Sequence, residues 1–540
     1  MLAPILAALL LVPPGSGVDR SPRQPIDVLD YRFALELTDS SDVIVGQATI
    51  DLRLLAAGLE QVFLDLIHPD AARAGTGMRV TAVTVGDRPA SYRQEQNRLI
   101  IALAAGPAAG DRLRIVVDYR GQPATGLIIA KNRHGDRSFF SDNWPDKSRH
   151  WLPVIDHISD KATAEFSVTA PGHYQVISNG IEIERTDLVG GRRRTVWRQS
   201  VPIAPWLFAL GVARFAVQHV GWHRAIPIST WVFAADRDAG FYDFAVPTKA
   251  AMAFYEEWVG PYSYEKLANV QSNSVSGGME AASSIFYSAG SVTGTRDPGW
   301  QNVIVHEVAH QWFGNAVTER DWDDVWLSEG FATYFTLLFV EHAQGRDRFV
   351  EGLRSSRASV LAFDQKNPAY RVVHDQLADM SQVTTGQTYQ KGAWTLHMLR
   401  SLIGDDAFWA GIRDYYRRYR DGQASTADFR QVMEAASDRK LEWFFNQWLY
   451  RGGSPALAGA WRYDRVKKTV DLELTQTQPG DPFRLSMEVA LRFPDGTHRT
   501  ERIDLSDRRH RYTWPAAQDP ARLDLDPNVR TLFSGSVARR

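Results

Sequence analysis

Two histidines four residues apart could bind a single metal ion. His306 and His310 lie in the stretch VHEVAHQW, and side chains at this spacing project from one face of a helix, about one turn apart. Two imidazoles placed in this way can offer nitrogen ligands to zinc. Glu307 would lie about 100° further round the helix, beside the metal rather than on it. It is therefore predicted to accept a proton from a zinc-bound water as a general base.

A third metal ligand is expected from a second helix. The stretch WLSEGFATY has helical periodicity, and eighteen residues separate its Glu329 from His310. A helix packed antiparallel to the first could bring this carboxylate to the two imidazoles. Two His and one Glu leave a fourth position open for water, as in catalytic rather than structural zinc sites. The joint pattern disfavours the alternative of a chance match, with two core histidines and a surface glutamate.

The composition restricts the class of protein and the kind of site. The 540 residues include no cysteine, which excludes disulfides, thiolate zinc sites and a cysteine nucleophile. Any metal must therefore be held by His, Asp and Glu. A net charge of -2 argues against a protein that binds nucleic acid through its charge. Hydrophobic residues at 44% and aromatic residues at 11% indicate a folded chain, and its length predicts two to four domains.

The elements that must position these residues begin with an all-β region. Between residues 25 and 220, short alternating runs are separated by turn residues, which predicts an N-terminal β domain. The sequences SNG at 178–180 and VGG at 189–191 are both typical of hairpin turns.

The remainder of the chain divides into a helical region and a second β region. Residues 221–457 are predicted to form the catalytic domain, with helical spacing in Val246–Trp258 and nearly throughout Thr395–Leu449. Alternation returns in residues 458–540, which predicts a smaller C-terminal β domain.

The first residues carry a targeting signal. Leu2–Val12 is an unbroken apolar run followed by PPGSG, too short for a transmembrane helix of about 20 residues. It fits the hydrophobic region and cleavage site of a signal peptide over residues 1–17. The protein is therefore predicted to be exported to a periplasm or secreted, and to be cytoplasmic if the run is not a signal. No other segment is expected to span a membrane.

The zinc motif and the stretch after it resemble a known peptidase family. HEVAHQWFGN followed by WLSEGFATYF is similar to the gluzincin aminopeptidases of peptidase family M1, relatives of aminopeptidase N and leukotriene hydrolase, with Ser328 where Asn is usual. Further family-like segments follow in the expected order: RHWLP at 149–153 with DKA at 160–162, VISNG at 176–180, PWLF at 205–208, SGGMEA at 276–281, YQKGA at 389–393 and FNQWL at 445–449. The resemblance therefore covers nearly the whole chain.

A predicted substrate-binding segment consists of Gly277, Gly278, Met279 and Glu280. Two glycines let an extended backbone approach a bound peptide closely, and the edge of such a strand can hydrogen-bond it by β-augmentation. The resemblance implies that the carboxylate of Glu280 binds the free α-ammonium of the substrate. The chain departs from the family pattern in having Ala281 for the usual Asn. The stretch Ser141–Trp144 also has no clear counterpart of the glutamine that helps to hold the amine.

The resemblance implies a further catalytic residue in the stretch YQKGAW. Tyr389 matches the tyrosine of the family whose phenol faces the tetrahedral oxyanion and supplements the zinc as an electrophile. Asp323 and Asp324, between the two halves of the zinc motif, are expected to lie in a solvated loop, with orientation of a histidine as the alternative.

These observations lead to one expected architecture and activity. The fold class is multidomain α+β, with an N-terminal β-sandwich, a thermolysin-like α/β catalytic domain and a C-terminal β-sandwich, without the large helical C-terminal domain of many relatives. The function is a zinc-dependent aminopeptidase that binds one Zn²⁺ per chain and cleaves the first bond of peptides with a free N-terminus. The alternatives are a zinc endopeptidase or an epoxide hydrolase using the same site, and a catalytically silent binding protein.

Overall fold

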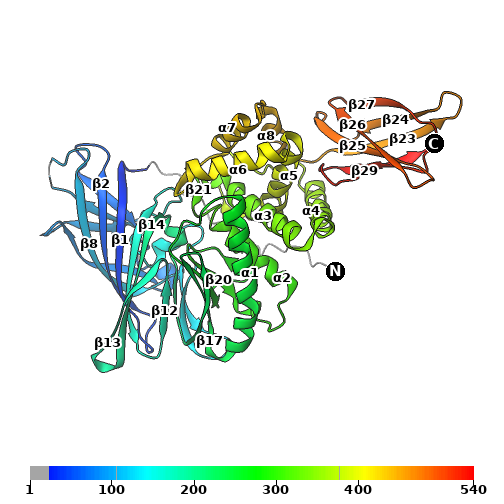
Figure 1. Cartoon of the computed structure of the whole chain (residues 1–540). Coiled ribbons are helices and arrows are strands. Elements are labelled where there is room, and N and C mark those ends of the chain that lie inside the picture. The colour runs from blue at the N-terminus through cyan, green and yellow to red at the C-terminus, as the bar shows by residue number, and fades with distance from the viewer. Residues whose placement is uncertain (1–22, 105, 376) are drawn as a thin grey trace.

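The computed structural model describes residues 23–104, 106–375 and 377–540, and the chain folds there into three parts in sequence order (Figure 1). A β-rich part, blue to cyan, is followed by a helical part in green and yellow and by strands in orange and red. This confirms the predicted order of β-rich, helical and β-rich regions. The predicted signal peptide, residues 1–17, lies outside the described residues. None of the helices in the described ranges is long and apolar enough to cross a lipid bilayer.

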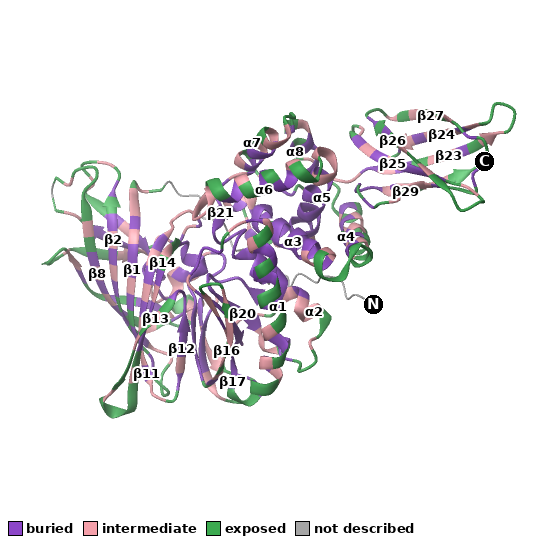
Figure 2. Ribbon diagram, viewed as in Figure 1, coloured by how far each residue is buried: buried purple, intermediate pink, exposed green. Residues whose placement is uncertain are grey.

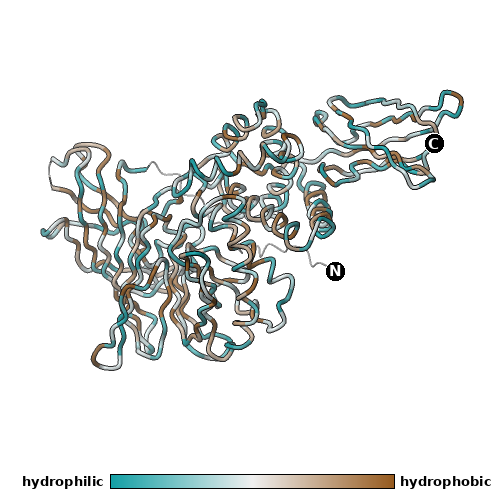
Figure 3. The backbone as a smooth tube through the Cα atoms, in the orientation of Figure 1, coloured by the Kyte–Doolittle hydropathy of each residue, from teal (hydrophilic) through white to brown (hydrophobic). Residues whose placement is uncertain are grey.

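The N-terminal part is built on three sheets. They contain β1 (Ile26–Glu36), β2 (Ile44–Leu54), β3 (Gln61–Asp65), β4 (Gly77–Val85), β5 (Arg88–Pro89), β6 (Tyr92–Glu95), β7 (Arg98–Ala102), β8 (Arg112–Gln122), β9 (Leu127–Lys131), β10 (Arg137–Ser141), β11 (Ala162–Pro171), β12 (Gln175–Ser178), β13 (Ile181–Leu188), β14 (Arg192–Ile203) and β15 (Leu210–Ala213). The largest sheet has the order β13-β14-β11-β1-β2-β8-β4-β5, and the others are β12-β15-β10-β9 and β3-β7-β6. Hydropathy alternates along these strands (Figure 3). In β2 every second residue from Ile44 to Leu54 is buried, as the sequence pattern predicts.

One of the two predicted hairpin turns is wrong. Val189–Gly191 does connect the antiparallel strands β13 and β14. Asn179-Gly180, however, connects β12 to β13, and these strands belong to different sheets. The reason lies in the buried side chain of Asn179, which donates hydrogen bonds to the carbonyl oxygens of Leu207 (2.9 Å) and Ala282 (2.7 Å). These contacts hold the turn between the N-terminal part and the segment that follows Glu280.

A five-stranded sheet begins the middle part of the chain. It contains β16 (Phe215–His223), β17 (Ile226–Phe233), β18 (Leu267–Ser272), β19 (Gly278–Met279) and β20 (Ser284–Ser288), in the order β16-β17-β18-β20-β19. The first strand therefore straddles residue 221, where the catalytic domain is predicted to begin. The short strand β19 forms one edge of this sheet, antiparallel to β20, so one side of its backbone has no strand partner in the described chain.

Helices make up most of the remaining middle part. They are α1 (Arg237–Trp258), α2 (Pro298–His310), α3 (Trp326–Gln344), α4 (Arg346–Lys366), α5 (Gly392–Ile403), α6 (Asp405–Tyr419), α7 (Thr426–Ser437) and α8 (Glu442–Trp448), with a π-helical turn over Gln387–Lys391. Short 3₁₀ turns lie at Ala71–Arg73, Ser148–His150, Val189–Gly191, Pro205–Leu207, Ala234–Asp236, Ala289–Ser291, Trp322–Asp324 and Met380–Gln382. The strands β21 (Val317–Glu319) and β22 (Gly422–Ala424) pair in parallel. Buried residues are concentrated where α3 and α5 lie (Figure 2).

The C-terminal part consists of two sheets. It contains β23 (Ala456–Asp464), β24 (Thr469–Gln476), β25 (Leu485–Arg492), β26 (His498–Leu505), β27 (Arg509–Pro515), β28 (Arg522–Leu525) and β29 (Ser534–Arg539). The sheet orders are β27-β24-β23-β29 and β26-β25-β28. The alternation of residues 458–540 is seen in β24 to β27, which confirms a β-rich region there.

Two glycines allow close contact between α3 and the start of α5. A Cβ atom added to Gly392 would lie 2.9 Å from the Cα of Gly330, and a Cβ added to Gly330 would lie 2.9 Å from the Cα of Gly392. Separations this short cannot be relieved by a side-chain rotation, because both atoms belong to backbone. This contact brings the π-helical turn, which carries Tyr389, to the N-terminal end of α3, which carries Glu329.

We expect Gly392→Ala to separate these two helices and to destabilise the fold. Overpacking of a tight contact costs about 1–3 kcal/mol, which should lower the midpoint of thermal unfolding by several degrees. Gly386→Ala is the matched control, because an added Cβ there has no atom within 4 Å. Circular dichroism melting curves of the two variants and the parent check this prediction. Equal midpoints for all three proteins would contradict the role of the glycine contact.

Candidate metal centre and active site

The predicted metal ligands lie together in a buried cluster. His306 and His310 come from the C-terminal half of α2, and Glu329 comes from the first turn of α3. The two Nε2 atoms are 3.1 Å apart, and each lies 3.3 Å from Oε2 of Glu329. Helix α2 starts at Pro298, because the side chain of Asp297 accepts hydrogen bonds from two backbone N–H groups of its first turn and proline is favoured as the first residue.

The ring of His310 is oriented by two neighbours. Its Nδ1 lies 3.1 Å from the carbonyl oxygen of Phe313 and 3.0 Å from Oγ of Ser328. A carbonyl can only accept, so Nδ1 carries a proton, and Nε2 is the nitrogen that can bind a metal when the ring is neutral. Gly314 lies against the same site, and a side chain there would collide with Ser328. Ser328 stands where the family usually has Asn, and its position next to Glu329 is the sequence signal for this role.

The charges of the site favour a cation. Burial raises the pKa of Glu280 to about 7 and that of Glu307 well above its usual range. Burial also opposes a charge on His310, yet Glu280 and Glu329 outweigh it and raise its pKa to about 10. Three buried carboxylates and two imidazoles therefore attract positive charge strongly. Two nitrogen donors and one carboxylate oxygen facing one another are the donor set that Zn²⁺ prefers, so the residues present fit this metal.

Glu307 lies on α2 beside the edge strand β19. Its carboxylate packs so closely against Gly278 that any Cβ at that position would overlap it. One of its oxygens, Oε2, is buried and has no hydrogen-bond partner among the described residues. Carboxylate oxygens of Glu280 and Glu307 and a ring nitrogen of His310 lie within 4.8 Å of one another. Glu307 therefore faces the cluster with an oxygen that is not engaged elsewhere.

Two side chains just beyond α2 hold the backbone of Glu280. Gln311 Nε2 and Asn315 Nδ2 both donate to the carbonyl oxygen of Glu280, at 3.0 Å and 2.6 Å. Gln311 Oε1 in turn accepts from the backbone N–H of Ser283 at 2.9 Å. The stretch HEVAHQWFGN thus supplies both the candidate metal ligands and the support for the candidate substrate segment. The contacts of these two residues with Glu280 were not predicted, although both residues lie within this motif.

The stretch Ser141–Trp144 makes structural contacts. Asn143 is buried and donates to the carbonyl oxygen of Phe208 at 2.8 Å. Asp142 forms an ion pair with Lys147 at 2.8 Å. Both side chains therefore serve contacts within the N-terminal part of the chain, and the lack of a second amine ligand stays a prediction.

Tyr389 lies in the π-helical turn that precedes α5. Its ring is nearly parallel to that of His306, with centroids 6.1 Å apart and an angle of 18° between the planes. Burial, followed by the charge of Glu329, raises the pKa of its hydroxyl well above the usual range. A buried ion pair supports the turn, since Lys391 Nζ lies 3.2 Å from Oδ2 of Asp364. Tyr389 therefore remains a neutral phenol that can donate a hydrogen bond.

The expectation of a solvated loop for Asp323 and Asp324 is wrong. Asp324 accepts a hydrogen bond from the hydroxyl of Thr426 at 2.6 Å, and Asp323 accepts one from the backbone N–H of Leu377 at 2.7 Å. Both carboxylates connect the loop before α3 to later segments of the chain. The side chain that contacts Nδ1 of His310 is instead Ser328.

Comparisons with known proteins extend over both the N-terminal and the helical part. The Peptidase M1 N-terminal domain matches residues 28–207, and the Peptidase family M1 domain matches residues 242–448. The glutamyl aminopeptidase of Mus musculus is 26% identical over 494 residues, which cover 87% of this chain and 52% of that protein. Aminopeptidase A of Gloydius brevicauda is 27% identical over 477 residues, or 84% of this chain and 48% of that protein.

A third similar protein is named for an interaction with a protease rather than for an aminopeptidase activity. The Tricorn protease-interacting factor F2 of Thermoplasma volcanium is 27% identical over 347 residues, covering 62% of this chain and 43% of that protein. The chain spans about half the length, or less, of the curated relatives that it matches. The two matched domains follow one another in the order in which the β-rich and helical parts occur, and the second contains the buried cluster of histidines and glutamates. The chain belongs to peptidase family M1.

Proposed function

We propose that this protein is a zinc-dependent aminopeptidase that hydrolyses the first bond of peptides with a free N-terminus. One observation carries the proposal. The Nε2 atoms of His306 and His310 and Oε2 of Glu329 lie within 3.3 Å of one another, beside the unpartnered carboxylate oxygen of Glu307. This combination provides metal ligands and a separate base in one buried volume.

The three ligands would hold one Zn²⁺ per chain. When bound, zinc acts as a Lewis acid on a substrate carbonyl and makes a water beside it more acidic. Glu307 accepts a proton from the attacking water at Oε2 and later donates it to the nitrogen of the leaving amine. Its burial raises its pKa, which makes it a stronger base than an exposed glutamate. The side chain of Glu307 therefore moves the proton in both halves of the reaction.

Tyr389 would stabilise the charge that develops on the carbonyl oxygen. Its phenol is neutral and buried close to His306, where a hydrogen bond to an oxyanion is not weakened by water. The ion pair of Lys391 and Asp364 fixes the turn that carries the phenol.

Substrate binding would use the edge strand β19 and the residue that follows it. Gly277, Gly278 and Met279 can pair with an extended peptide through main-chain hydrogen bonds. Glu280 would bind the α-ammonium at the end of this strand, since its carboxylate is buried among the histidines and glutamates of the metal site. Its backbone is held by Gln311 and Asn315, which limits how far the carboxylate can move. A fixed anion beside the metal favours cleavage at the first peptide bond over cleavage within the chain.

We extend the proposal to the architecture. Residues 221–457 would form a thermolysin-like catalytic domain, and residues 25–220 and 458–540 would form β-sandwich domains on either side of it in the sequence. Export through a signal peptide over residues 1–17 stays a prediction.

We expect Glu307→Gln to retain zinc and to lose activity by at least about 10³-fold, because this side chain moves protons and is not a ligand. Glu329→Ala should lose zinc, because one of three protein ligands is removed. Zinc content by mass spectrometry and hydrolysis of aminoacyl-anilides, with and without a chelator, measure both effects. Glu256→Gln is the control for the charge change, since the side chain of Glu256 is also buried but lies on α1, paired with His223. Loss of zinc from Glu307→Gln would contradict the assigned roles, and an inactive parent enzyme would favour the silent binding protein.

We expect Tyr389→Phe to lower kcat by about 10²–10³-fold with little change in KM, since a donor to the transition state is removed. Tyr334→Phe removes a hydroxyl from another buried tyrosine, which contacts Nδ1 of His397 at 3.1 Å, and should leave kcat unchanged. Steady-state kinetics on one aminoacyl-anilide compare the two variants. An effect of Tyr389→Phe on KM alone would indicate a role in binding the ground state.

We expect N-acetylated peptides to be cleaved at least about 100-fold more slowly than the same peptides with a free amine. Acetylation removes the cation and leaves the carboxylate of Glu280 buried without a partner. Glu280→Gln should slow cleavage of the free peptide and reduce this ratio, whereas Glu256→Gln should preserve it. Mass spectrometry of the products gives both rate and cleavage position. Equal rates on both peptides, with cuts inside the chain, would support the endopeptidase alternative.

A further inference from the structure

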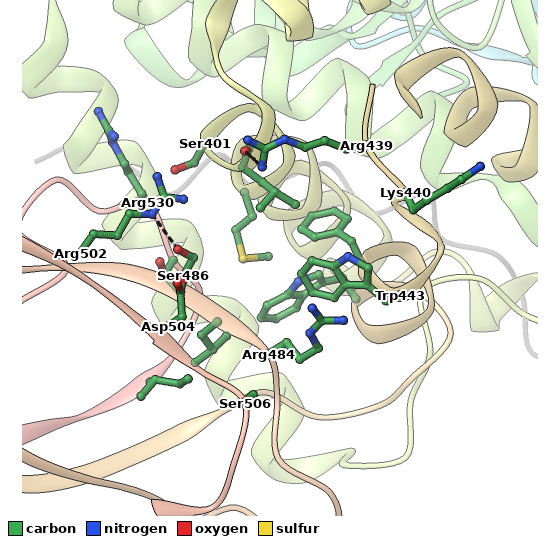
Figure 4. A pocket seen from close by; sticks show the side chains of 17 residues that line it. Ser401, Arg439, Lys440, Trp443, Arg484, Ser486, Arg502, Asp504, Ser506 and Arg530 are labelled. Atoms are coloured by element: carbon green, nitrogen blue, oxygen red, sulfur yellow. Dashed lines mark hydrogen bonds between the residues drawn. The ribbon is translucent and has the colours of Figure 1, made fainter. Parts of the chain in front are cut away.

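A large cavity lies between the helical part and the C-terminal sheets, on residues that the proposed reaction does not use. Its volume is about 810 Å³, within the range of about 300–1,000 Å³ typical of small-molecule sites. One wall comes from α5, α8 and the turn before α8, and the other from β25, β26 and the segment between β28 and β29 (Figure 4). The two walls belong to different parts of the chain, so a ligand in the cavity would contact both parts.

The charged side chains that line the cavity are mostly basic. It contains five basic side chains, Arg439, Lys440, Arg484, Arg502 and Arg530, against a single carboxylate, Asp504. Arg530 is neutralised by Glu488, which lies 3.1 Å away outside the cavity. The other four basic groups have no ion pair to a carboxylate in the part of the chain that the structure describes. Most other arginines of the C-terminal sheets are paired with an acidic neighbour, so this cluster attracts anions.

The unpaired guanidinium groups are oriented by neutral partners. Arg484 lies over the ring of Trp443 at 4.2 Å, Arg502 donates from Nε to Oγ of Ser486 at 2.8 Å, and Arg439 donates to a backbone carbonyl at 2.9 Å. Each of these contacts uses one face or one N–H of the guanidinium and leaves other donors free. Fixed guanidinium groups with free donors bind carboxylate, sulfonate or phosphate groups at two points.

The cavity also has an apolar surface. Trp443, Phe444 and Trp448 of α8 line it together with Met398 and Leu505. Figure 4 shows the aromatic rings grouped between Arg484 and Arg439 on one side, with Arg502 and Arg530 on the other. A small inorganic ion would contact the basic groups of only one side and none of the rings.

We propose that this cavity binds an organic anion with an aromatic or apolar body and at least two negatively charged groups. The body packs on the rings of α8, and the charged groups contact Arg439 and Arg484 on one side and Arg502 on the other. Bound in this way, the anion joins the helical part to the C-terminal sheets. The site is independent of the metal ligands and of the proposed peptidase activity.

Naphthalene-1,5-disulfonate is a suitable probe, because it carries two anionic groups on a rigid aromatic body and its sulfonates are weak metal ligands. It is titrated by calorimetry into the full-length, zinc-loaded protein at fixed ionic strength. The expected result is saturable binding at one site per chain, and weaker binding both of ethane-1,2-disulfonate, which lacks the aromatic body, and of naphthalene-2-ethanol, which lacks the charge. No saturable binding of the probe at millimolar concentration would overturn the proposal.

Variants locate the bound probe. Arg484→Gln and Arg439→Gln should each weaken binding by about tenfold or more, the usual loss for a charge-assisted hydrogen bond. Asp504→Asn should strengthen binding, because it removes the only carboxylate of the lining. Arg509→Gln makes the same charge change on exposed β27, outside the cavity, and should leave binding unchanged. An equal effect of Arg509→Gln and Arg484→Gln would mean general attraction to surface charge and would overturn the proposal.

Discussion

The burial of three glutamates around two histidines is the interaction on which the rest of the middle part depends. Glu280, Glu307 and Glu329 are each less than 7% exposed, and each would lose several kcal/mol of hydration if it were ionised without a partner. The arrangement is favourable only where positive charge is shared among the carboxylates. A divalent cation held by the two imidazoles and Glu329 would supply that charge, which is why we propose these five side chains as a metal site rather than a set of structural ion pairs.

One helix positions most of these groups. Helix α2 carries both histidines and Glu307, and the residues directly after it, Gln311 and Asn315, hold the carbonyl of Glu280. A displacement of α2 would therefore move the metal ligands, the base and the substrate segment together. The glycine contact between α3 and α5 connects the third ligand to Tyr389 in the same way. The relative positions of the groups are thus set by backbone contacts rather than by flexible side chains.

The helical part also contacts the C-terminal sheets, and the basic cavity lies between them. The metal centre is surrounded by acidic groups, whereas the cavity beside α8 is surrounded by basic ones. A ligand whose charge suits one of these sites would therefore be disfavoured at the other because of its charge. Binding at the basic cavity would act on how the C-terminal sheets pack against α5 and α8, and α5 begins directly after the turn that carries Tyr389. Helix α5 therefore borders both sites, although the cluster and the cavity lining share no residue.

The sequence by itself determined which side chains could form the centre and the nature of most elements. The spacing of His306, His310 and Glu329 depends on helical geometry, which is a local property. The alternation in the strands depends on burial of one face of a sheet, and this burial is visible in the residue pattern. Only the tertiary structure decided which groups support the site. Asn179-Gly180 looks like a hairpin turn, but contacts with residues distant in sequence make it a connection between sheets. The contacts of Gln311 and Asn315 and the basic cavity likewise could not be predicted, because their partners are set by packing between elements and not by spacing along the chain.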